Sequence, residues 1–155
     1  MSNLMLSRPC TYAIRALTFL AMQPAGKLCG TREISEHESI PHSFLAKVLL
    51  PLRRARLLRS FKGIGGGYEL TAPPEQISLL MIVRSIDGEP LTDCLLEDHP
   101  CSSPRRCILH SYWSTVREQL LGHLERTTLA DIVRLRQADA SQGPAPVPAV
   151  VSDAL

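Results

Sequence analysis

The chain has few aromatic side chains, little net charge and no long apolar run. It contains three phenylalanines, three tyrosines and one tryptophan among 155 residues. Such a small supply of aromatic side chains predicts a modest core helped by self-association, in one compact domain or in one small domain plus a partner-binding element. The longest obvious apolar run, at residues 79–83, is far shorter than the roughly 20 residues that cross a bilayer. We therefore expect no membrane span and no membrane partner.

A secretory leader and the common nucleotide and redox motifs are also lacking. No basic leader of the secretory kind is visible, and Arg15 interrupts the first apolar stretch, which is patterned as an amphipathic helix. Neither a CxxC pair nor a GKS or GKT sequence occurs. We expect a cytoplasmic chain whose five cysteines are reduced thiols or metal ligands rather than disulfides.

The net charge is small, but the charged residues are unevenly distributed along the chain. The net charge is +2, yet residues 1–80 hold ten Lys or Arg against five Asp or Glu, whereas residues 81–155 hold seven against ten. Five cations in the basic part follow one another without a carboxylate: Arg53, Arg54, Arg56, Arg59 and Lys62. On charge alone, this run fits a surface that attracts phosphate and a solvated helix end equally well.

Two short helices with a tight connection are predicted after a first helix. The first helix begins near Ser7, with a proline in its first turn, and ends at Pro24. Thr31 is expected to cap the second helix. The third helix should begin within residues 39–41 and continue to about residue 54.

The third helix has one apolar and one polar face. Apolar residues recur at helical spacing: Phe44, Leu45, Val48, Leu49 and Leu52. The other face carries small polar and basic residues: His42, Ser43, Lys47, Arg53 and Arg54. This pattern is typical of a helix-turn-helix that reads DNA. Pro51 removes one backbone hydrogen bond and is expected to bend or loosen the last turn.

A β-hairpin with a glycine-rich tip is predicted next. Residues 57–61 and 68–71 are interpreted as short strands joined by Lys62-Gly-Ile-Gly-Gly-Gly67. Such a wing can follow the phosphate backbone and place Lys62 at the minor groove. A nucleotide-binding loop is the alternative, but its glycines would have to open a helix.

Three further helices are predicted in the C-terminal half. Ser78 caps a helix that ends at residues 87–88. The next helix carries an apolar seam typical of a helix that meets another helix: Trp113, Val116, Leu120 and Leu124. Thr127 or Thr128 caps a last short helix, and the composition from Ala138 onward predicts a disordered tail.

A segment rich in metal-binding residue types lies between these helices. Cys94, Cys101, Cys107 and His110 follow the spacing Cys-x6-Cys-x5-Cys-x2-His. An irregular backbone would let the thiolates fold back on one metal, and Cys107 and His110 would share the first turn of the following helix. Soft sulfur ligands select zinc, copper(I) or iron-sulfur clusters, and the spacing alone does not choose among them.

Other interpretations of this segment remain open. The cysteines could be unligated and partly buried, or they could hold structural zinc without any sensing role. A thiol enzyme with Cys101 or Cys107 as nucleophile and His110 as base is a remote alternative, because no third group orients the base and the basic wing would have no role. We expect no enzyme.

These segments resemble the Rrf-type winged-helix transcriptional regulators of bacteria, which include IscR, NsrR and RirA. The resemblance covers about residues 4–136 and is carried by LSRPCTYAIRAL, ISEHESIPHSFLAKVLLPLRRARLL, KGIGGGYEL, ISLLMIVRSIDG and TTLADIV. It implies a mainly α fold with a winged helix-turn-helix DNA-binding domain at residues 1–88 and a cluster-binding loop at 89–110. A dimerisation helix and a short helix follow at 111–137, and the tail occupies 138–155.

The resemblance also implies a homodimer whose long helices cross, meeting through the seam of Trp113, Val116, Leu120 and Leu124. It implies an iron-sulfur cluster, with 2Fe-2S favoured over 4Fe-4S, held by Cys94, Cys101 and Cys107. His110 matches the histidine of IscR-like members. NsrR-like members use a carboxylate from the partner's first helix instead, and the matching residue here is Thr11, beside Cys10.

The implied function is a transcriptional regulator, a repressor or an activator, that senses iron-sulfur status, redox state or nitric oxide and binds a palindromic operator in double-stranded DNA. We expect Ser43, Lys47 and His42 to face the major groove, and Arg53, Arg54, Arg59 and Lys62 to hold phosphate or line the minor groove. Ala46 stands where IscR-like members place a carboxylate, so the preferred operator should differ. Arg56 stands where the family often has glycine, at a turn expected to be strained.

Overall fold

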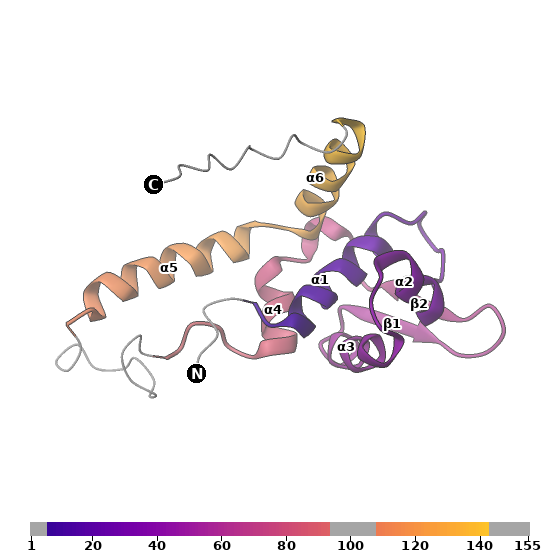
Figure 1. Cartoon of the computed structure of the whole chain (residues 1–155), viewed down its shortest axis with the longest axis horizontal. Coiled ribbons are helices and arrows are strands. Elements are labelled where there is room, and N and C mark those ends of the chain that lie inside the picture. Colours follow the sequence, from indigo (N-terminus) through magenta and orange to yellow (C-terminus); the bar gives the residue numbers. More distant parts are fainter. Residues whose placement is uncertain (1–5, 94–107, 143–155) are drawn as a thin grey trace, which may run out of the picture.

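The computed structural model describes residues 6–93 and 108–142. Over these ranges the chain is mainly helical with one antiparallel hairpin, which confirms the expected fold class (Figure 1). The elements are α1 (Arg8–Ala21), α2 (Thr31–Glu38), α3 (His42–Arg54), β1 (Leu58–Phe61), β2 (Gly67–Leu70), η1 (Pro74–Gln76), α4 (Leu79–Asp87), α5 (His110–Arg126) and α6 (Leu129–Gln142).

Side-chain caps set several helix starts where the sequence predicts them. The Ser7 hydroxyl accepts a hydrogen bond from the Cys10 N–H at 3.1 Å at the start of α1. Ser78 accepts one from the Met81 N–H at 3.2 Å at the start of α4. Thr128 opens α6 with a reciprocal capping box, in which its N–H donates to the Asp131 carboxylate at 2.8 Å. These caps satisfy donors that the first helical turn leaves without a partner.

One expectation about the helix-turn-helix is wrong in detail. The residue that caps α2 is Gly30, and Thr31 is already the first helical residue. Helix α3 begins at His42, directly after the expected start, and continues through Pro51 to Arg54, as predicted. The ring of Pro51 removes one N–H, but the Pro51 carbonyl still accepts from the Ala55 N–H at 2.9 Å, so the following turn keeps its hydrogen bond.

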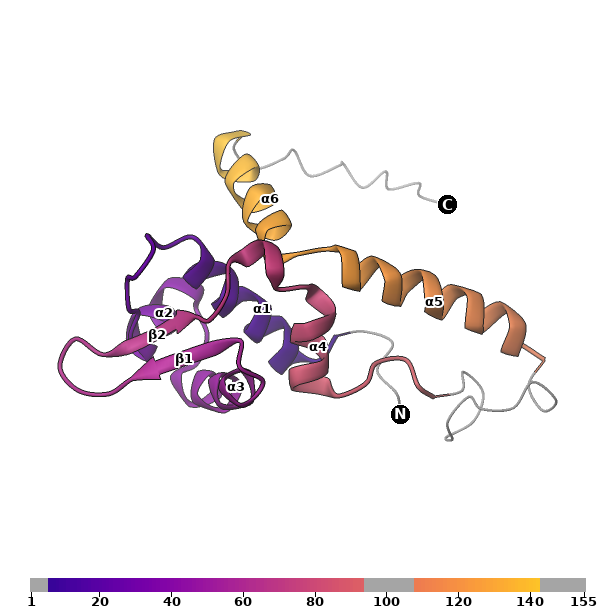
Figure 2. The ribbon, with the colours of Figure 1, turned by 180° about the vertical axis from the view of Figure 1, so that it is seen from behind.

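The core lies where α1, α3, β1 and the start of α6 meet. The largest fully buried side chains in the described ranges are Leu17, Ile34, Ile40, Leu45, Val48, Leu49, Leu52, Leu58, Ile77, Ile82, Val83 and Leu129. They come from all parts of the N-terminal body and from the first turn of α6. Figure 2 shows the hairpin beside α3 and α6 rising next to α1.

The hairpin is extended by a third short segment. Strand β1 pairs with β2 in the register Leu58↔Leu70 to Phe61↔Gly67. Strand β1 begins one residue later than predicted, and β2 begins and ends one residue earlier. Cys29 exchanges backbone hydrogen bonds of 3.1 and 2.8 Å with Tyr68. A Cβ atom on Gly67 would lie 2.7 Å from the Cys29 carbonyl carbon, so only glycine allows this approach.

Helix α5 projects from this body and α6 returns to it. Helix α5 packs on α4 at one end and then extends away, whereas α6 packs on α1 and η1 (Figure 1). Helix α6 reaches Gln142, past the predicted start of the tail at Ala138. The alanines at 138 and 140 are the strongest helix formers, which explains this extension. None of the helices in the two described ranges is long and apolar enough to span a bilayer.

Candidate nucleic-acid interface

Helix α3 presents one face to the core and the other outward. Leu45, Val48, Leu49 and Leu52 are buried, whereas the residues expected to read bases are exposed: His42, Ser43 and Lys47. Phe44 was predicted on the apolar face but is 41% exposed. Its ring meets Tyr12 of α1 edge-on, with centroids 6.0 Å apart. The outward face of α3 therefore combines polar groups with an aromatic ring.

Weak contacts orient the first turns of α3 without occupying its outer face. His42 Nε2 lies 3.2 Å from the Thr31 hydroxyl at the start of α2. The Lys47 ammonium lies 5.7 Å from the centre of the Phe44 ring. An exposed cation–π contact contributes only about 0.5–1 kcal/mol, so a phosphate or a base edge can displace it.

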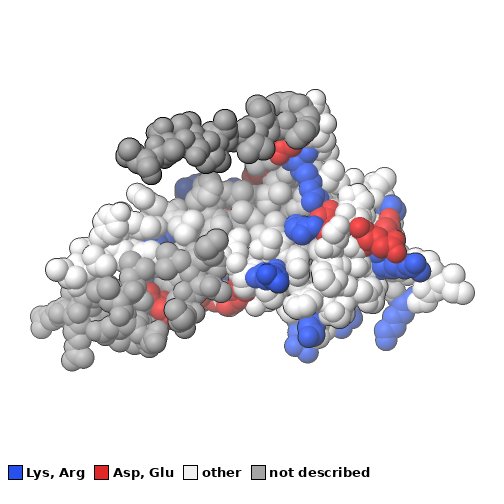
Figure 3. Space-filling view, viewed as in Figure 1, with Lys and Arg blue, Asp and Glu red and all other residues white. Residues whose placement is uncertain are grey.

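Three cations gather where α3 ends and the hairpin begins. Arg53 and Arg54 lie in the last turn of α3, where the helix dipole favours positive charge, and both are exposed. Arg53 donates to the Ser60 hydroxyl of β1 at 3.2 Å. Arg56 has a φ of 58°, which confirms the strained turn predicted at this position. Figure 3 shows Lys and Arg side chains over this lower part of the body.

Arg59 is less free than the sequence indicates. Its guanidinium donates to the Glu69 carboxylate at 2.6 Å, directly across the hairpin. It also lies 5.9 Å from the centre of the Phe61 ring. Arg59 remains 58% exposed, and an arginine has five N–H donors, so the bonded guanidinium can still donate to a phosphate.

The tip of the wing is nearly bare backbone. Gly63 and Gly65 have positive φ values of 97° and 77°, which the turn requires. Lys62 at its base is exposed, and Ile64 at its apex is fully exposed to solvent. The wing thus offers a cation and one apolar side chain beside exposed peptide groups.

The residues expected to hold a cluster are only partly within the described ranges. Cys94, Cys101 and Cys107 lie outside them. His110 is the first residue of α5 and is half-buried. The described residues contain no group of three His, Cys, Asp or Glu arranged to hold a metal.

The two described flanks of the cysteine segment are tied together. The Trp113 indole donates from Nε1 to the Asp93 carbonyl at 3.2 Å. Asp93 immediately precedes Cys94, and Trp113 follows His110 by one helical turn. Asp93, the last described residue before the cysteine segment, therefore lies next to the first turns of α5.

The cysteines in the described ranges are poor ligands. Cys10 and Cys29 are free thiols with no exposed surface. Burial, with a further contribution from Asp87, raises the pKa of Cys10 to about 12. Burial also raises the pKa of Cys29. Because the thiolate is the form that binds metal, both residues act as core side chains in this conformation.

The four side chains of the apolar seam on α5 differ in how exposed they are. Trp113 is buried within its own chain, Val116 and Leu124 are half-buried, and Leu120 is 38% exposed. Two other large side chains at this end of the molecule, Ile108 and Tyr112, are more exposed than any of these four. Trp113 is therefore covered within its own chain, where its indole bonds to the Asp93 carbonyl.

The comparisons with known proteins agree with this arrangement. The profile of the Rrf2 family, described as an iron-dependent transcriptional regulator, matches residues 6–135. The chain belongs to the Rrf2 family. It is therefore a DNA-binding regulator of transcription with a winged helix-turn-helix, and not an enzyme.

Relatives of this Rrf2 protein are regulators from several bacteria. An HTH-type transcriptional regulator of Mycobacterium tuberculosis is 39% identical over 130 residues, which are 82% of this chain and 80% of the relative. IscR of Aliivibrio salmonicida is 28% identical over 79% of this chain and 73% of the relative.

Solved Rrf2 structures show the same fold. CymR, the global cysteine regulator of B. subtilis, superimposes with a TM-score of 0.73 at 24% identity, over 85% of this chain and 98% of CymR. IscR of T. potens has a TM-score of 0.69 at 24% identity, over 93% and 95% of the two chains.

Sequence reasoning missed two partners in this Rrf2 chain. The Arg59–Glu69 pair is local, and aligning the two predicted strands around the glycine tip would have placed these residues opposite each other. The ion pair between Arg136 of α6 and Glu38 of α2 joins residues 98 positions apart, and no local sequence pattern predicts it.

Proposed function

We propose that this Rrf2 protein is a cytoplasmic homodimer that binds a palindromic operator and changes its DNA binding with the state of an iron-sulfur cluster. The observation that carries the proposal is the hydrogen bond between Asp93 and Trp113, which joins the residue before Cys94 to the first turns of the projecting helix α5, the helix that begins at His110. A change at the cluster would thus act next to the helix that we assign to dimerisation.

The DNA-reading roles follow from exposure and charge. Ser43, Lys47 and His42 contact base edges in the major groove. Lys47 meets Phe44 through a weak cation–π contact, so it can turn toward a guanine. Phosphate and the minor groove are contacted by the cations at the end of α3 and on the wing: Arg53, Arg54, Arg59 and Lys62. These contacts set the register on the duplex, and the base contacts set sequence preference.

Dimerisation through α5 is supported by how little of that helix is covered. Trp113 is the one buried residue among its 17 residues. Leu120 is the most exposed member of the seam, with Val116 and Leu124 half-buried beside it. A second copy of α5 would cover these side chains, and a two-fold dimer would read half-sites roughly 34 Å apart or a multiple of that distance.

The donor set fits an iron-sulfur cluster held by Cys94, Cys101, Cys107 and His110. Three thiolates are the usual ligands of such clusters, and a histidine ligand is known chemistry for them. When bound, the cluster would supply one-electron redox chemistry. His110 would hold its ring near the start of α5, while Trp113 fixes the adjoining backbone. The burial and raised pKa of Cys10 argue against that thiol as the fourth ligand.

Anaerobic purification tests the cluster. Visible absorption, Mössbauer spectra, iron and acid-labile sulfide should all be present, and His110→Ala should alter the spectrum more than Cys10→Ala does. Zinc in place of iron would leave a regulator without sensing. Protein that stays colourless and free of sulfide after reconstitution would contradict the proposal.

Selection from a random-sequence duplex library tests the operator. The wild-type protein should enrich a palindrome, and footprinting should show two protected half-sites on one face. Enrichment of a single half-site by a monomer would contradict the dimeric reading mode.

A further inference from the structure

Glu38 is a buried carboxylate in an unfavourable place. It is the last residue of α2 and is 2% exposed. A negative charge at the C-terminal end of a helix opposes the helix dipole, and its burial removes water. Burial alone would raise the pKa of Glu38, but bonds from Arg136, His37 and Arg15 outweigh it and lower the pKa. Glu38 is therefore an ionised carboxylate whose burial is offset by its bonds to these partners.

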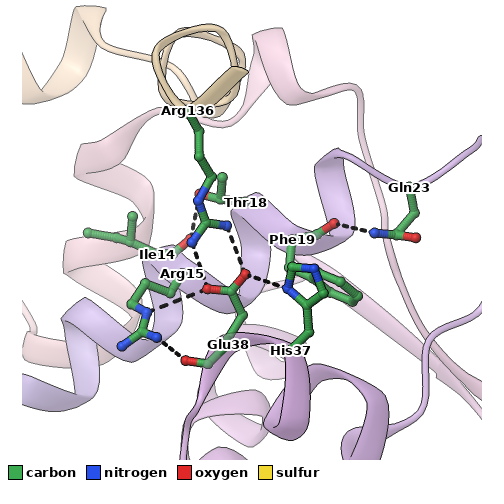
Figure 4. A network of polar contacts seen from close by, with 8 residues as sticks. All are labelled: Ile14, Arg15, Thr18, Phe19, Gln23, His37, Glu38 and Arg136. Atoms are coloured by element: carbon green, nitrogen blue, oxygen red, sulfur yellow. Dashed lines mark hydrogen bonds and ion pairs between the residues drawn. The ribbon is translucent and has the colours of Figure 1, made fainter. Parts of the chain in front are cut away.

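Those partners come from three helices. Arg136 of α6 grips the carboxylate with both terminal nitrogens, at 2.8 and 2.7 Å. Arg15 of α1 lies 3.5 Å from the same carboxylate and also donates to the Glu38 backbone carbonyl. His37 Nδ1 lies 3.2 Å away. Figure 4 shows Arg136 reaching down from α6 and Arg15 across from α1 onto this single side chain.

The carboxylate stands at the turn that aims α3. Ser39, the next residue, has a φ of 50° and reverses the chain. Within the turn, the Ser35 hydroxyl donates to the Ile40 carbonyl at 2.6 Å and the Ile40 N–H donates to the Ser35 carbonyl at 3.0 Å. These bonds are internal to the helix-turn-helix. Arg15 and Arg136 add bonds from outside, which fix the turn relative to the rest of the body.

Arg136 also links this turn to the projecting helix. Helix α6 follows α5 through Thr127 and Thr128. The Leu79 N–H donates to the Thr127 carbonyl at 2.8 Å, and the Leu129 N–H donates to the Ile77 carbonyl at 2.8 Å. The junction between α5 and α6 is thus anchored at the start of α4, and α6 carries Arg136 from there to Glu38.

We propose that Arg136 is a positioning residue for DNA recognition, and that its bidentate grip on Glu38 sets the angle at which α3 meets the major groove. The proposal rests on the DNA-reading role of α3 proposed above. A bidentate arginine fixes geometry as well as charge, and an ion pair with one buried partner can specify an arrangement even where it adds little net stability. Loss of the grip therefore affects base reading more than phosphate contact.

The test compares Arg136→Gln and Arg136→Lys with wild type on two duplexes. One is the palindrome that the wild-type protein selects from the random library, and the other is a scrambled duplex of equal length. Arg136→Gln should lower affinity for the palindrome tenfold or more and affinity for the scrambled duplex less than twofold, because the outer cations are unchanged. Arg136→Lys keeps the charge but not the forked guanidinium, so its loss of affinity for the palindrome should lie between that of wild type and that of Arg136→Gln.

Arg134→Gln is the matched control, because Arg134 lies on the same helix and pairs at 2.8 Å with exposed Asp131. It should leave the ratio of the two affinities unchanged. All assays use protein shown to be folded by circular dichroism. If Arg136→Gln does not fold, Arg136→Lys alone decides the question. An unchanged affinity ratio in the folded variants overturns the proposal. Failure of the wild-type protein to select any palindrome would instead overturn the proposed operator.

Discussion

The N-terminal body and helix α5 differ in how they are held. Helix α1 buries seven side chains along 14 residues, whereas α5 buries one along 17. The body has its own core, and its helices α1 and α4 begin at side-chain caps. Helix α5 has Trp113 covered within its own chain and leaves apolar side chains such as Tyr112 exposed. The N-terminal body is thus stabilised by contacts within one chain. We propose that the exposed apolar side chains of α5 are covered only when two copies of the chain meet.

The largest effect should come from opening the body's core. Leu52 is fully buried in α3, so Leu52→Ala should lower the free energy of unfolding by about 2–5 kcal/mol. Urea denaturation followed by circular dichroism measures this. Leu50→Ala, in the same helix but 40% exposed, is the control and should cost far less. Equal losses would mean that α3 does not separate an inner from an outer face.

The next effect concerns α5 alone. Leu120→Lys should place a charge in the proposed interface and weaken dimerisation at least tenfold, on the order of 1.4 kcal/mol. The thermal midpoint of the body should change little, since Leu120 is already 38% exposed within one chain. Sedimentation equilibrium measures the dimer dissociation constant, and calorimetry measures the thermal midpoint.

Gln119→Lys controls for the added charge, because Gln119 is exposed on α5 next to the seam. It should leave the dimer intact. A dimer that tolerates Leu120→Lys as well would place the contact between copies elsewhere.

A smaller effect is expected at the wing. Lys62→Ala should weaken binding to the selected palindrome roughly fivefold near 0.1 M salt and reduce the salt slope by about one per subunit. Fluorescence anisotropy at several salt concentrations gives both values. Lys27→Ala is the control, since Lys27 is bonded to Glu33 at 2.7 Å outside α3 and the wing. An unchanged affinity at moderate salt would remove the wing from the interface.

The body was the more predictable region because its signals are local. Caps at Ser7 and Ser78, helical spacing and the glycine tip fix the elements within a few residues. The Thr31 prediction failed because Gly30 can cap a helix without a side-chain bond. Phe44 was misplaced since Tyr12, far along the chain, covers only one edge of its ring.

The C-terminal half depends on contacts that the sequence does not display. The spacing of the apolar seam predicted a helix but not that Trp113 would be covered within its own chain and donate to Asp93. Likewise, Arg136 appears in the sequence as one more surface cation, and its ion pair with the buried Glu38 depends on how α6 packs on α1. The cluster ligands remain a prediction from residue types and spacing.

The smallest effect should appear at the junction between the two regions, in the capping box of α6. Hydrogen bonds from the Thr128 backbone and hydroxyl, with Arg134 nearby, lower the pKa of Asp131. A lowered folded pKa means that the ionised group stabilises the fold above its unfolded pKa of about 3.9, and that this contribution is lost as pH falls through the folded value. Asp131→Asn should therefore be slightly less stable than wild type at pH 7, and the two should converge below pH of about 4.

Urea midpoints measured from neutral to acid pH give this difference directly. Asp139→Asn, farther along the exposed side of α6, controls for removal of one negative charge. A gap between wild type and Asp131→Asn that stays constant with pH would show that the amide disturbs packing rather than the charged cap. Convergence at low pH would instead show that the ionised Asp131 carboxylate stabilises the junction between α5 and α6. This junction would then be held by a side-chain cap, as the starts of α1 and α4 are, whereas we propose that α5 itself is held by a second copy of the chain.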